Sequence, residues 1–176
     1  MRFTETKVTG AFLIEPEPIA DERGFFARTF CREEFADHGL NPDLAQANVS
    51  FNHRKGTLRG MHYQQAPHQE AKLVRCTQGA IFDVVVDLRP RSPTHRAWSG
   101  AELTAGNRAM LYVPEDCAHG FLTLADDTEV AYQMSAPYVA GAGRGVRWVD
   151  PAFGIEWPGE VAVINERDRT YPDVGP

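Results

Sequence analysis

The clearest hydrophobic pattern in this chain is an alternation that runs from residue 81 to residue 89. One side of that segment carries Phe82, Val84, Val86 and Leu88, and the other carries Asp83, Val85, Asp87 and Arg89. A period of two indicates a β-strand, because successive side chains of a strand point to opposite faces. With a turn at Gln78-Gly79 and a stop at Pro90, the pattern predicts a strand over residues 80–88.

Short apolar segments of this kind recur along the chain between glycines and prolines. Strands are predicted over residues 10–15, 25–29, 45–50, 57–63, 72–77, 80–88, 97–104, 109–113, 120–125 and 129–135. A helix is expected over residues 31–38, closed by Gly39. After Pro137 the pattern weakens, and the glycine-rich run 141–145 is expected to be a mobile loop. These features predict an all-β fold, a double-sheet jelly-roll barrel with one or two short helices.

The composition favours one globular domain over residues 1–176. The chain is long enough for a substantial core, and its 43% hydrophobic and 24% charged residues are ordinary. A net charge of -6 argues against a nucleic-acid partner. No signal peptide or membrane-spanning run is visible, and three scattered cysteines suit a reducing compartment. We therefore expect a cytoplasmic protein with no membrane partner.

Four polar side chains fall where predicted strands would face a barrel interior. His62, Lys72 and Tyr132 lie within three different predicted strands, and a turn delivers His119 to the start of another. If these faces line the barrel, one pocket holds two histidines, a lysine and a tyrosine. Each residue alone is more often structural, so the interpretation rests on their coincidence.

Two arginines suggest that the pocket binds an anion. Arg59 flanks His62, and Arg23 lies in a polar run that ends in Gly24 and two phenylalanines. A planar guanidinium can donate two parallel hydrogen bonds to the oxygens of a pyrophosphate. Strict alternation groups Leu58, Gly60, His62 and Gln64 on one strand face and puts Arg59 on the other. Either a bulge at Gly60 re-aims a side chain, or Arg59 works at the barrel rim or in a subunit contact.

Metal and nucleophile chemistry fit the pattern less well. His62 and His68 are six residues apart, which is not the spacing of an HxH clamp, and His119 stands alone in its region. We therefore expect a pocket without metal or cofactor. A serine hydrolase is disfavoured because the chain has no Gly-x-Ser-x-Gly elbow.

The ordered set of motifs resembles the dTDP-4-dehydrorhamnose 3,5-epimerase family. The matching runs are residues 21–26, 46–48, 58–64, 72–74, 82–87, 92–94 and 118–121, with the segment from Trp148 to Pro158. They cover nearly the whole chain in the family's order. The resemblance implies a metal-free jelly roll of the cupin type, usually a homodimer, with a nucleotide-sugar substrate.

The resemblance also implies roles in proton transfer. His62 corresponds to the base that removes a proton beside the C4 ketone, and Asp168 to the carboxylate that orients it, with Asp83 as a second candidate. Tyr132 corresponds to the proton donor on the opposite face of the sugar. Lys72 corresponds to a cation beside the C4 oxygen, where negative charge develops.

Other positions correspond to substrate contacts in the family. Arg59 and Arg23 match contacts to the pyrophosphate, with Arg23 reaching across a dimer, and Tyr138 matches a ring that stacks on the nucleotide base. The remaining expected contacts are Gln46, Asn48, His119 and Arg167, where Arg167 replaces a common lysine. The chain differs from the family at two positions around the expected nucleotide and substrate. Arg28 and Gly143 stand where the family often has glutamate.

The expected function is therefore an isomerase that inverts C3, C5 or both in a dTDP-linked 4-keto-6-deoxyhexose through an enolate. A mono-epimerase is the nearest alternative. A non-catalytic sugar-nucleotide binding module would keep Arg23, Arg59 and Tyr138 but need no base. A 3,4-ketoisomerase and a metal-dependent oxygenase fit the residues less well.

Overall fold

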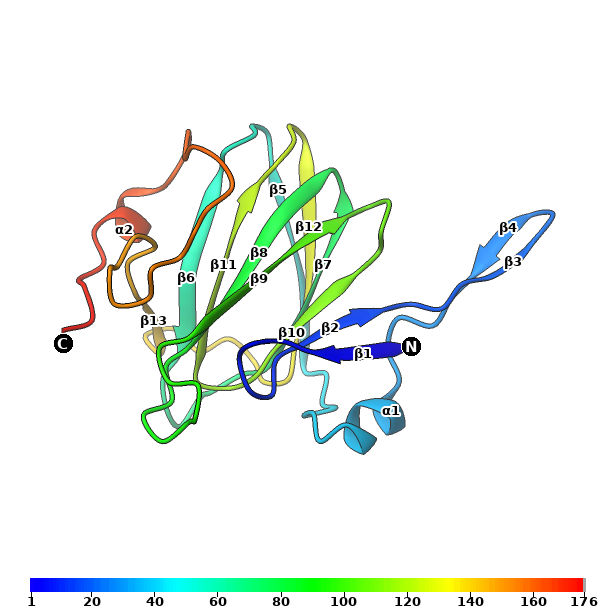
Figure 1. Cartoon of the computed structure of the whole chain (residues 1–176), viewed down its shortest axis with the longest axis horizontal. Helices are drawn as coiled ribbons and strands as arrows, with labels where there is room; N and C mark the ends of the chain where they lie inside the picture. The colour runs from blue at the N-terminus through cyan, green and yellow to red at the C-terminus, as the bar shows by residue number, and fades with distance from the viewer. Residues whose placement is uncertain (176) are drawn as a thin grey trace.

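Two antiparallel sheets form the body of the molecule in the computed structural model, which describes residues 1–175 (Figure 1). The first sheet has the order β1 (Arg2–Glu5), β2 (Phe12–Glu15), β10 (Met110–Val113), β7 (Lys72–Gln78), β12 (Thr128–Met134) and β5 (Gln46–Asn52). The second has the order β13 (Gly143–Gly145), β6 (Leu58–Gln64), β11 (Cys117–Thr123), β8 (Ala80–Asp87) and β9 (Trp98–Thr104). The predicted all-β, double-sheet architecture is confirmed.

A separate hairpin and two short helices complete the fold. The strands β3 (Ile19–Asp21) and β4 (Gly24–Phe26) pair with each other and project from the body (Figure 1). The helix α1 (Arg32–Asp37) has Cys31 and His38 as its caps, in agreement with the predicted range 31–38. The helix α2 (Glu166–Arg169) lies in the C-terminal segment.

The alternation in β8 explains why apolar side chains pack on both faces of the five-stranded sheet. Ile81 and Val85 join a core cluster that residues of both sheets build between them. Val84 and Val86 point the other way and pack against Phe153 of the C-terminal segment. Because both faces of β8 are buried, burial of apolar surface also holds the C-terminal segment against the outside of this sheet.

The outer face of the six-stranded sheet is covered by α1. Phe35 of the helix and Leu40 after it pack in a buried cluster with Ile14, Leu73 and Tyr112. A helix of six residues is not stable alone in water, so this packing supports it.

An extra residue in β6 decides which side chains face the cavity between the sheets. The strands β6 and β11 align at His62 with His119 and at Arg59 with Phe121. Gly60 and Met61 therefore lie opposite the single residue Gly120, which is the geometry of a β-bulge. Arg59 and His62 consequently line the same cavity, so the bulge is the correct one of the two alternatives for Arg59.

Glycine is required on both strands where the bulge forms. Gly60 has a φ of +145°, which L side chains rarely adopt, and a Cβ there would lie 2.6 Å from the Cα of Gly120. A Cβ on Gly120 would lie 2.7 Å from the Met61 sulfur and 2.8 Å from the Arg59 carbonyl oxygen. The two backbones can approach this closely only without side chains between them.

Some segments differ from the sequence-based expectation. The strands β1, β3 and β13 were not predicted, and the glycine-rich run expected to be a mobile loop forms β13, which pairs with β6. Glycines carry no side-chain periodicity, so the edge of β6 rather than a local pattern makes this strand. The strand β11 begins at Cys117 instead of residue 120, so His119 lies inside it and not at its start.

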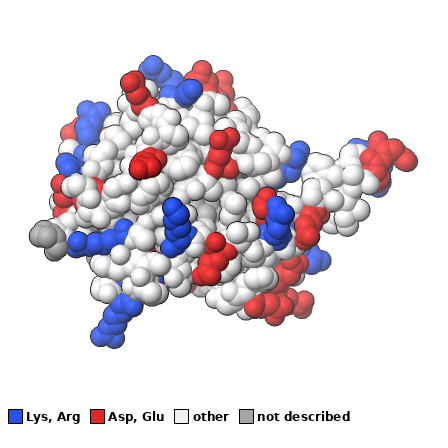
Figure 2. All heavy atoms as spheres, in the orientation of Figure 1, with Lys and Arg blue, Asp and Glu red and all other residues white. Residues whose placement is uncertain are grey.

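Charged side chains of both signs are interspersed on the face drawn in Figure 2, and acidic ones gather around α1. That helix contributes Glu33, Glu34 and Asp37. The face has no broad area of one sign. Among residues 1–175, no helix is long and apolar enough to cross a membrane.

We expect Gly120→Ala to destabilise the protein by about 1–3 kcal/mol, the usual cost of forcing an extra methyl into a packed position. The added Cβ would push on the carbonyl of Arg59 and the sulfur of Met61, and so displace the bulge. Urea unfolding measures the loss. Gly159→Ala is the control, because its Cβ would meet only a Leu122 methyl at 3.8 Å. Equal stability of the two variants would contradict this account.

Candidate active site

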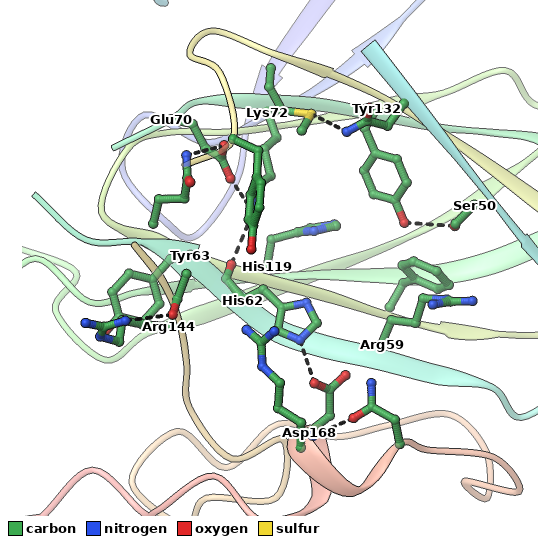
Figure 3. A pocket seen from close by; sticks show the side chains of 18 of the residues that line it. Ser50, Arg59, His62, Tyr63, Glu70, Lys72, His119, Tyr132, Arg144 and Asp168 are labelled. Carbon is green, nitrogen blue, oxygen red and sulfur yellow. Dashed lines mark hydrogen bonds and ion pairs between the residues drawn. The ribbon is translucent and has the colours of Figure 1, made fainter. Parts of the chain in front are cut away.

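A cavity of about 560 Å³ opens between the sheets. Its lining side chains come from strands of both sheets, from the segment around β13 and from α2 (Figure 3). This volume suits a ligand the size of a sugar and part of a nucleotide. Of the sequence-predicted site residues, the cavity brings together Asn48, Arg59, His62, Lys72, His119, Tyr132, Tyr138, Arg167 and Asp168.

His62 and Asp168 form a close pair although 106 residues separate them in the sequence. His62 Nε2 lies 2.7 Å from Asp168 Oδ1, and the second carboxylate oxygen accepts a hydrogen bond of 3.1 Å from the Gly60 N–H. The side chain of Asn165 caps α2 by accepting from the Asp168 N–H at 2.7 Å. A carboxylate only accepts, so Nε2 of the ring carries a hydrogen and Nδ1 is the basic nitrogen.

The charge state of Asp168 follows from these contacts. Burial alone would raise the pKa of Asp168, but the hydrogen bond and charge of His62, together with the Gly60 N–H, hold it below its usual value. The carboxylate is therefore ionised at neutral pH. An ionised partner fixes the tautomer of the histidine and stabilises its protonated form.

Lys72 lies at the inner end of the cavity and is almost fully buried. Its Nζ donates to the carbonyl oxygen of His62 at 3.2 Å and forms an ion pair of 3.3 Å with Glu70 (Figure 3). Burial lowers the pKa of Lys72, while the carboxylates of Glu70 and Asp83 oppose that shift.

A second histidine–carboxylate pair lies beside the first. His119 Nε2 is 2.7 Å from Asp83 Oδ1, and both residues are buried. His119 is also the cross-strand partner of His62, so the two imidazoles are neighbours on one sheet. Burial raises the pKa of Asp83, an effect that His119 and Lys72 counteract. Within residues 1–175 the other oxygen of Asp83 has no hydrogen-bond partner.

Tyr132 faces His62 and His119 from the opposite sheet. It lies on β12, its hydroxyl is 3.1 Å from Ser50 Oγ, and its ring meets that of His119 edge to face at 6.2 Å. Burial raises the pKa of Tyr132 far above its usual value. The phenol therefore keeps its proton at neutral pH.

The mouth of the cavity carries three arginines: Arg59, Arg144 and Arg167. Arg59 Nε donates to Asn52 Oδ1 at 2.7 Å, and Arg167 Nε donates to the Tyr171 hydroxyl at 2.6 Å. None of the three forms an ion pair with a carboxylate of the described chain. Their charge is therefore available to an anionic ligand.

The remaining predicted contacts lie outside this lining. Gln46 borders it and accepts a hydrogen bond of 2.9 Å from the N–H of Tyr138, a residue that lines the mouth with a half-exposed ring. Arg23 lies on the projecting hairpin, where it pairs with Asp21, and does not line the cavity of its own chain. Arg28 pairs with Glu34 of α1 at 2.7 Å and is also outside the lining, whereas Gly143 is part of it.

Sequence reasoning missed several lining residues. Glu70 precedes its strand in a loop, so no strand alternation could assign it to the cavity. Arg144 lies in the glycine-rich run that was expected to be a loop. Ser50 had a weak signal, because alternation in the edge strand puts it on the face of Asn48. Among the described residues, no three His, Cys, Asp or Glu side chains are grouped to hold a metal ion.

The model of the family dTDP-4-dehydrorhamnose 3,5-epimerase matches residues 5–175. The chain is 43% identical over 175 residues to the dTDP-4-dehydrorhamnose 3,5-epimerase of Sinorhizobium fredii, covering 99% of this chain and 90% of that protein. These matches extend over the strands and helices that build the cavity.

Solved structures agree with this similarity. A crystal structure of dTDP-4-dehydrorhamnose 3,5-epimerase from Bacillus anthracis, with TDP and PPi bound, superposes with a TM-score of 0.93 at 39% identity, covering 98% of this chain and 99% of that one. ChmJ, a 3'-monoepimerase from Streptomyces bikiniensis in complex with dTDP-quinovose, gives 0.85 at 34% identity, covering 94% and 84%. The relatives thus include enzymes whose names state epimerisation at two carbons and one whose name states epimerisation at a single carbon.

We expect Asp168→Asn to lower stability by about 1–2 kcal/mol at pH 7, because it removes the charge from a buried hydrogen bond. The pKa of Asp168 is lower in the folded than in the unfolded chain, so its stabilisation is full above about pH 4 and is lost as the pH falls through the lowered pKa. Urea unfolding at pH 7 and pH 3 should therefore show a difference between wild type and variant that shrinks in acid.

Asp173→Asn is the control for that measurement. Asp173 lies in the same segment and pairs with Arg147, but it is partly exposed, so its loss should cost about 1 kcal/mol or less. If the Asp168 variant showed the same difference at both pH values, the carboxylate would not be the charged partner of His62.

Proposed function

This chain belongs to the dTDP-4-dehydrorhamnose 3,5-epimerase family, and we propose that it inverts both C3 and C5 of its substrate, with His62 removing a proton and Tyr132 donating one. It is an isomerase that acts on dTDP-linked 4-keto-6-deoxy sugars. One observation carries the proposed mechanism: a carboxylate-paired imidazole and a protonated phenol lie on opposite sheets and line the same cavity.

The first step is removal of a proton from the carbon beside the ketone. Nδ1 of His62 accepts this proton, because Nε2 is bound to Asp168. The carbon–hydrogen electron pair moves toward the C4 carbonyl and leaves negative charge on its oxygen. Asp168 stabilises the imidazolium that forms, as the carboxylate does in other histidine-based sites.

The second requirement is to stabilise the enolate. Lys72 and His119 line the inner end of the cavity beside His62, where they would meet the C4 oxygen of a bound sugar. A fixed cation and a hydrogen-bond donor at that point stabilise the charge more in the transition state than in the ground state. This difference lowers the barrier to proton removal.

Inversion needs an acid on the other face of the sugar ring. Tyr132 comes from the opposite sheet and keeps its proton at neutral pH, so it donates to the carbon from the side away from His62. Water then restores the proton of Tyr132 and takes the one from His62. Repetition at the second α-carbon gives the doubly inverted product.

The arginines at the mouth suit the diphosphate. Arg59 and Arg167 present guanidinium groups without carboxylate partners in the described chain, and Tyr138 offers a half-exposed ring for stacking on the base. We propose that Asn48 and Gln46 contribute further polar contacts from β5. A Cβ on Gly143 would lie 3.6 Å from an Arg167 nitrogen and 3.9 Å from the Tyr138 ring, so a side chain at this position would lie beside two of the proposed nucleotide contacts.

We also propose that the enzyme works as a homodimer in the cytoplasm. The projecting hairpin exposes 73% of Ile19 and 74% of Phe26, and the edge strand β5 exposes 60% of Val49 and 42% of Phe51. Exposed apolar groups on a hairpin and an edge strand favour an interface. In such a dimer the hairpin would carry Arg23 to the diphosphate in the partner's cavity.

A deuterium experiment tests the mechanism. With dTDP-4-keto-6-deoxyglucose in deuterated water, the wild type should incorporate deuterium at C3 and C5 with inversion at both. His62→Ala should slow incorporation at least 10²-fold, because the base is gone. Tyr132→Phe should still exchange hydrogen through His62 but should invert at least tenfold more slowly than it exchanges.

Nuclear magnetic resonance follows deuterium incorporation and inversion in one sample. Incorporation at a single carbon would contradict double epimerisation and support a mono-epimerase. A His62→Ala protein with wild-type exchange would show that another group is the base, and equal loss of exchange and inversion in Tyr132→Phe would remove the two-sided mechanism.

A second experiment tests the dimer. Sedimentation equilibrium should give twice the chain mass, and Arg23→Ala should weaken dTDP binding about tenfold through loss of a charge-assisted contact. Arg32→Ala is the matched control, because Arg32 is an exposed residue of α1, outside the hairpin, and forms an ion pair of 2.7 Å with Asp43. A monomer, or two arginine variants with unchanged affinity, would contradict the proposal.

A further inference from the structure

Glu70 is a buried carboxylate of the cavity to which the mechanism above gives no role. Its side chain is only 7% exposed, and it lines the cavity beside Lys72 (Figure 3). It lies in the loop between β6 and β7, two residues before Lys72. A carboxylate in such a position is costly unless it is paired, so its partners indicate its role.

Both oxygens of Glu70 are engaged. Oε1 forms the 3.3 Å ion pair with Lys72 Nζ, and Oε2 accepts a hydrogen bond of 2.9 Å from Gln64 Nε2. Gln64 is itself fixed, because its Oε1 accepts from the Val139 N–H at 2.8 Å. A carboxylate held from two sides is poorly suited to remove a proton from a substrate, so Glu70 is not a second base.

The contacts of Lys72 leave one donor for a ligand. An ammonium has three N–H groups. One bonds the carbonyl oxygen of His62 at 3.2 Å, and the ion pair with Glu70 directs a second. The third remains for the cavity that Lys72 lines. Glu70 and the His62 carbonyl together therefore fix where the last N–H points.

We propose that Glu70 is a positioning residue that keeps the ammonium of Lys72 charged and directs its remaining N–H toward the carbonyl oxygen of the substrate. This inference rests on the proposed function, because it assumes that an enolate forms beside Lys72. Glu70 acts through Lys72 and does not itself touch the sugar.

The groups around Lys72 support this role. Asp83 of β8 is close enough to raise the pKa of Lys72, the His62 carbonyl of β6 accepts from its ammonium, and His119 of β11 and Tyr132 of β12 line the same cavity. Asp83 is already hydrogen-bonded to His119. Glu70 is therefore the one carboxylate near Lys72, among the described residues, that is not shared with a histidine. Its removal would leave a buried ammonium whose nearest counter-ion is committed elsewhere, and such a group loses its proton more readily.

The pH dependence of turnover gives a readout that a purely structural role would not move. Burial lowers the pKa of Lys72 and raises that of Tyr132, so loss of the lysine proton sets the alkaline limit of activity. Glu70 raises the pKa of Lys72. In Glu70→Gln the alkaline limb of kcat should therefore move to lower pH, by about one unit or more.

We expect Glu70→Gln to lower kcat at pH 7.5 about ten- to a hundredfold, with little change in KM, because the lost stabilisation acts on developing charge. Adding Glu70→Gln to Lys72→Met should cost less than about threefold more, since a positioning residue has nothing left to position. Glu102→Gln is the control, because it makes the same chemical change at an exposed position of β9.

Each outcome decides the proposal. An unchanged alkaline limb in a folded Glu70→Gln protein, or a further tenfold loss in the Lys72→Met background, would overturn it. If Glu70→Gln does not fold, Glu70→Asp keeps the charge and should retain the wild-type limb with a lower kcat; a shifted limb there would also overturn the proposal. Wild-type deuterium exchange is the reference: its absence would refute the proposed function and the role of Glu70 with it, whereas normal wild-type exchange with an unchanged alkaline limb in Glu70→Gln would refute the role of Glu70 alone.

Discussion

The site depends on the extra residue that β6 inserts opposite Gly120. In a regular strand Arg59 and His62 would point to opposite faces, and only one of them could reach the cavity. The bulge brings both to the same side, and it leaves the Gly60 N–H to bond Asp168 instead of a neighbouring strand. One backbone irregularity therefore orients the imidazole, aims a guanidinium at the cavity mouth and supplies a donor to the carboxylate.

The second condition is that the C-terminal segment stays against the five-stranded sheet. Asp168 comes from α2, which has only four residues and little stability of its own. The outward residues of β8 pack against Phe153, and the ring of Phe82 meets that of Trp157 edge to face at 6.3 Å. Packing on the outer face of the five-stranded sheet thus holds Asp168 in the cavity. Residues that do not line the cavity therefore affect the geometry of the pair His62–Asp168.

These two features also explain how far the sequence predicts the structure. Alternation in β7 and β12 correctly groups Lys72 and Tyr132 with the interior, because each side chain's face is set by its own strand. In β8 alternation separated Asp83 and Val85 from Phe82 and Val84 but did not indicate which face is inside. Alternation could not choose the direction of Arg59, because a bulge is decided by the approach of two backbones. The role of Asp168 could be predicted only from the family resemblance, since nothing in a polar C-terminal segment indicates contact with a histidine 106 positions earlier. Glu70 had no periodic signal in its loop.

The distribution of charge in the cavity suits one orientation of the proposed substrate. Inside, every cation or imidazole has a carboxylate: His62 has Asp168, His119 has Asp83 and Lys72 has Glu70. Burying ionisable groups in this way is tolerable because each one has a partner within hydrogen-bond or ion-pair distance. At the mouth the arginines have no such partners in the described chain, although the protein as a whole has a net charge of -6. In the proposed function this charge distribution places the diphosphate at the rim and the neutral sugar in the interior. In the proposed mechanism the negative charge on the sugar would form beside groups already held in place, so little reorganisation would be needed when it develops.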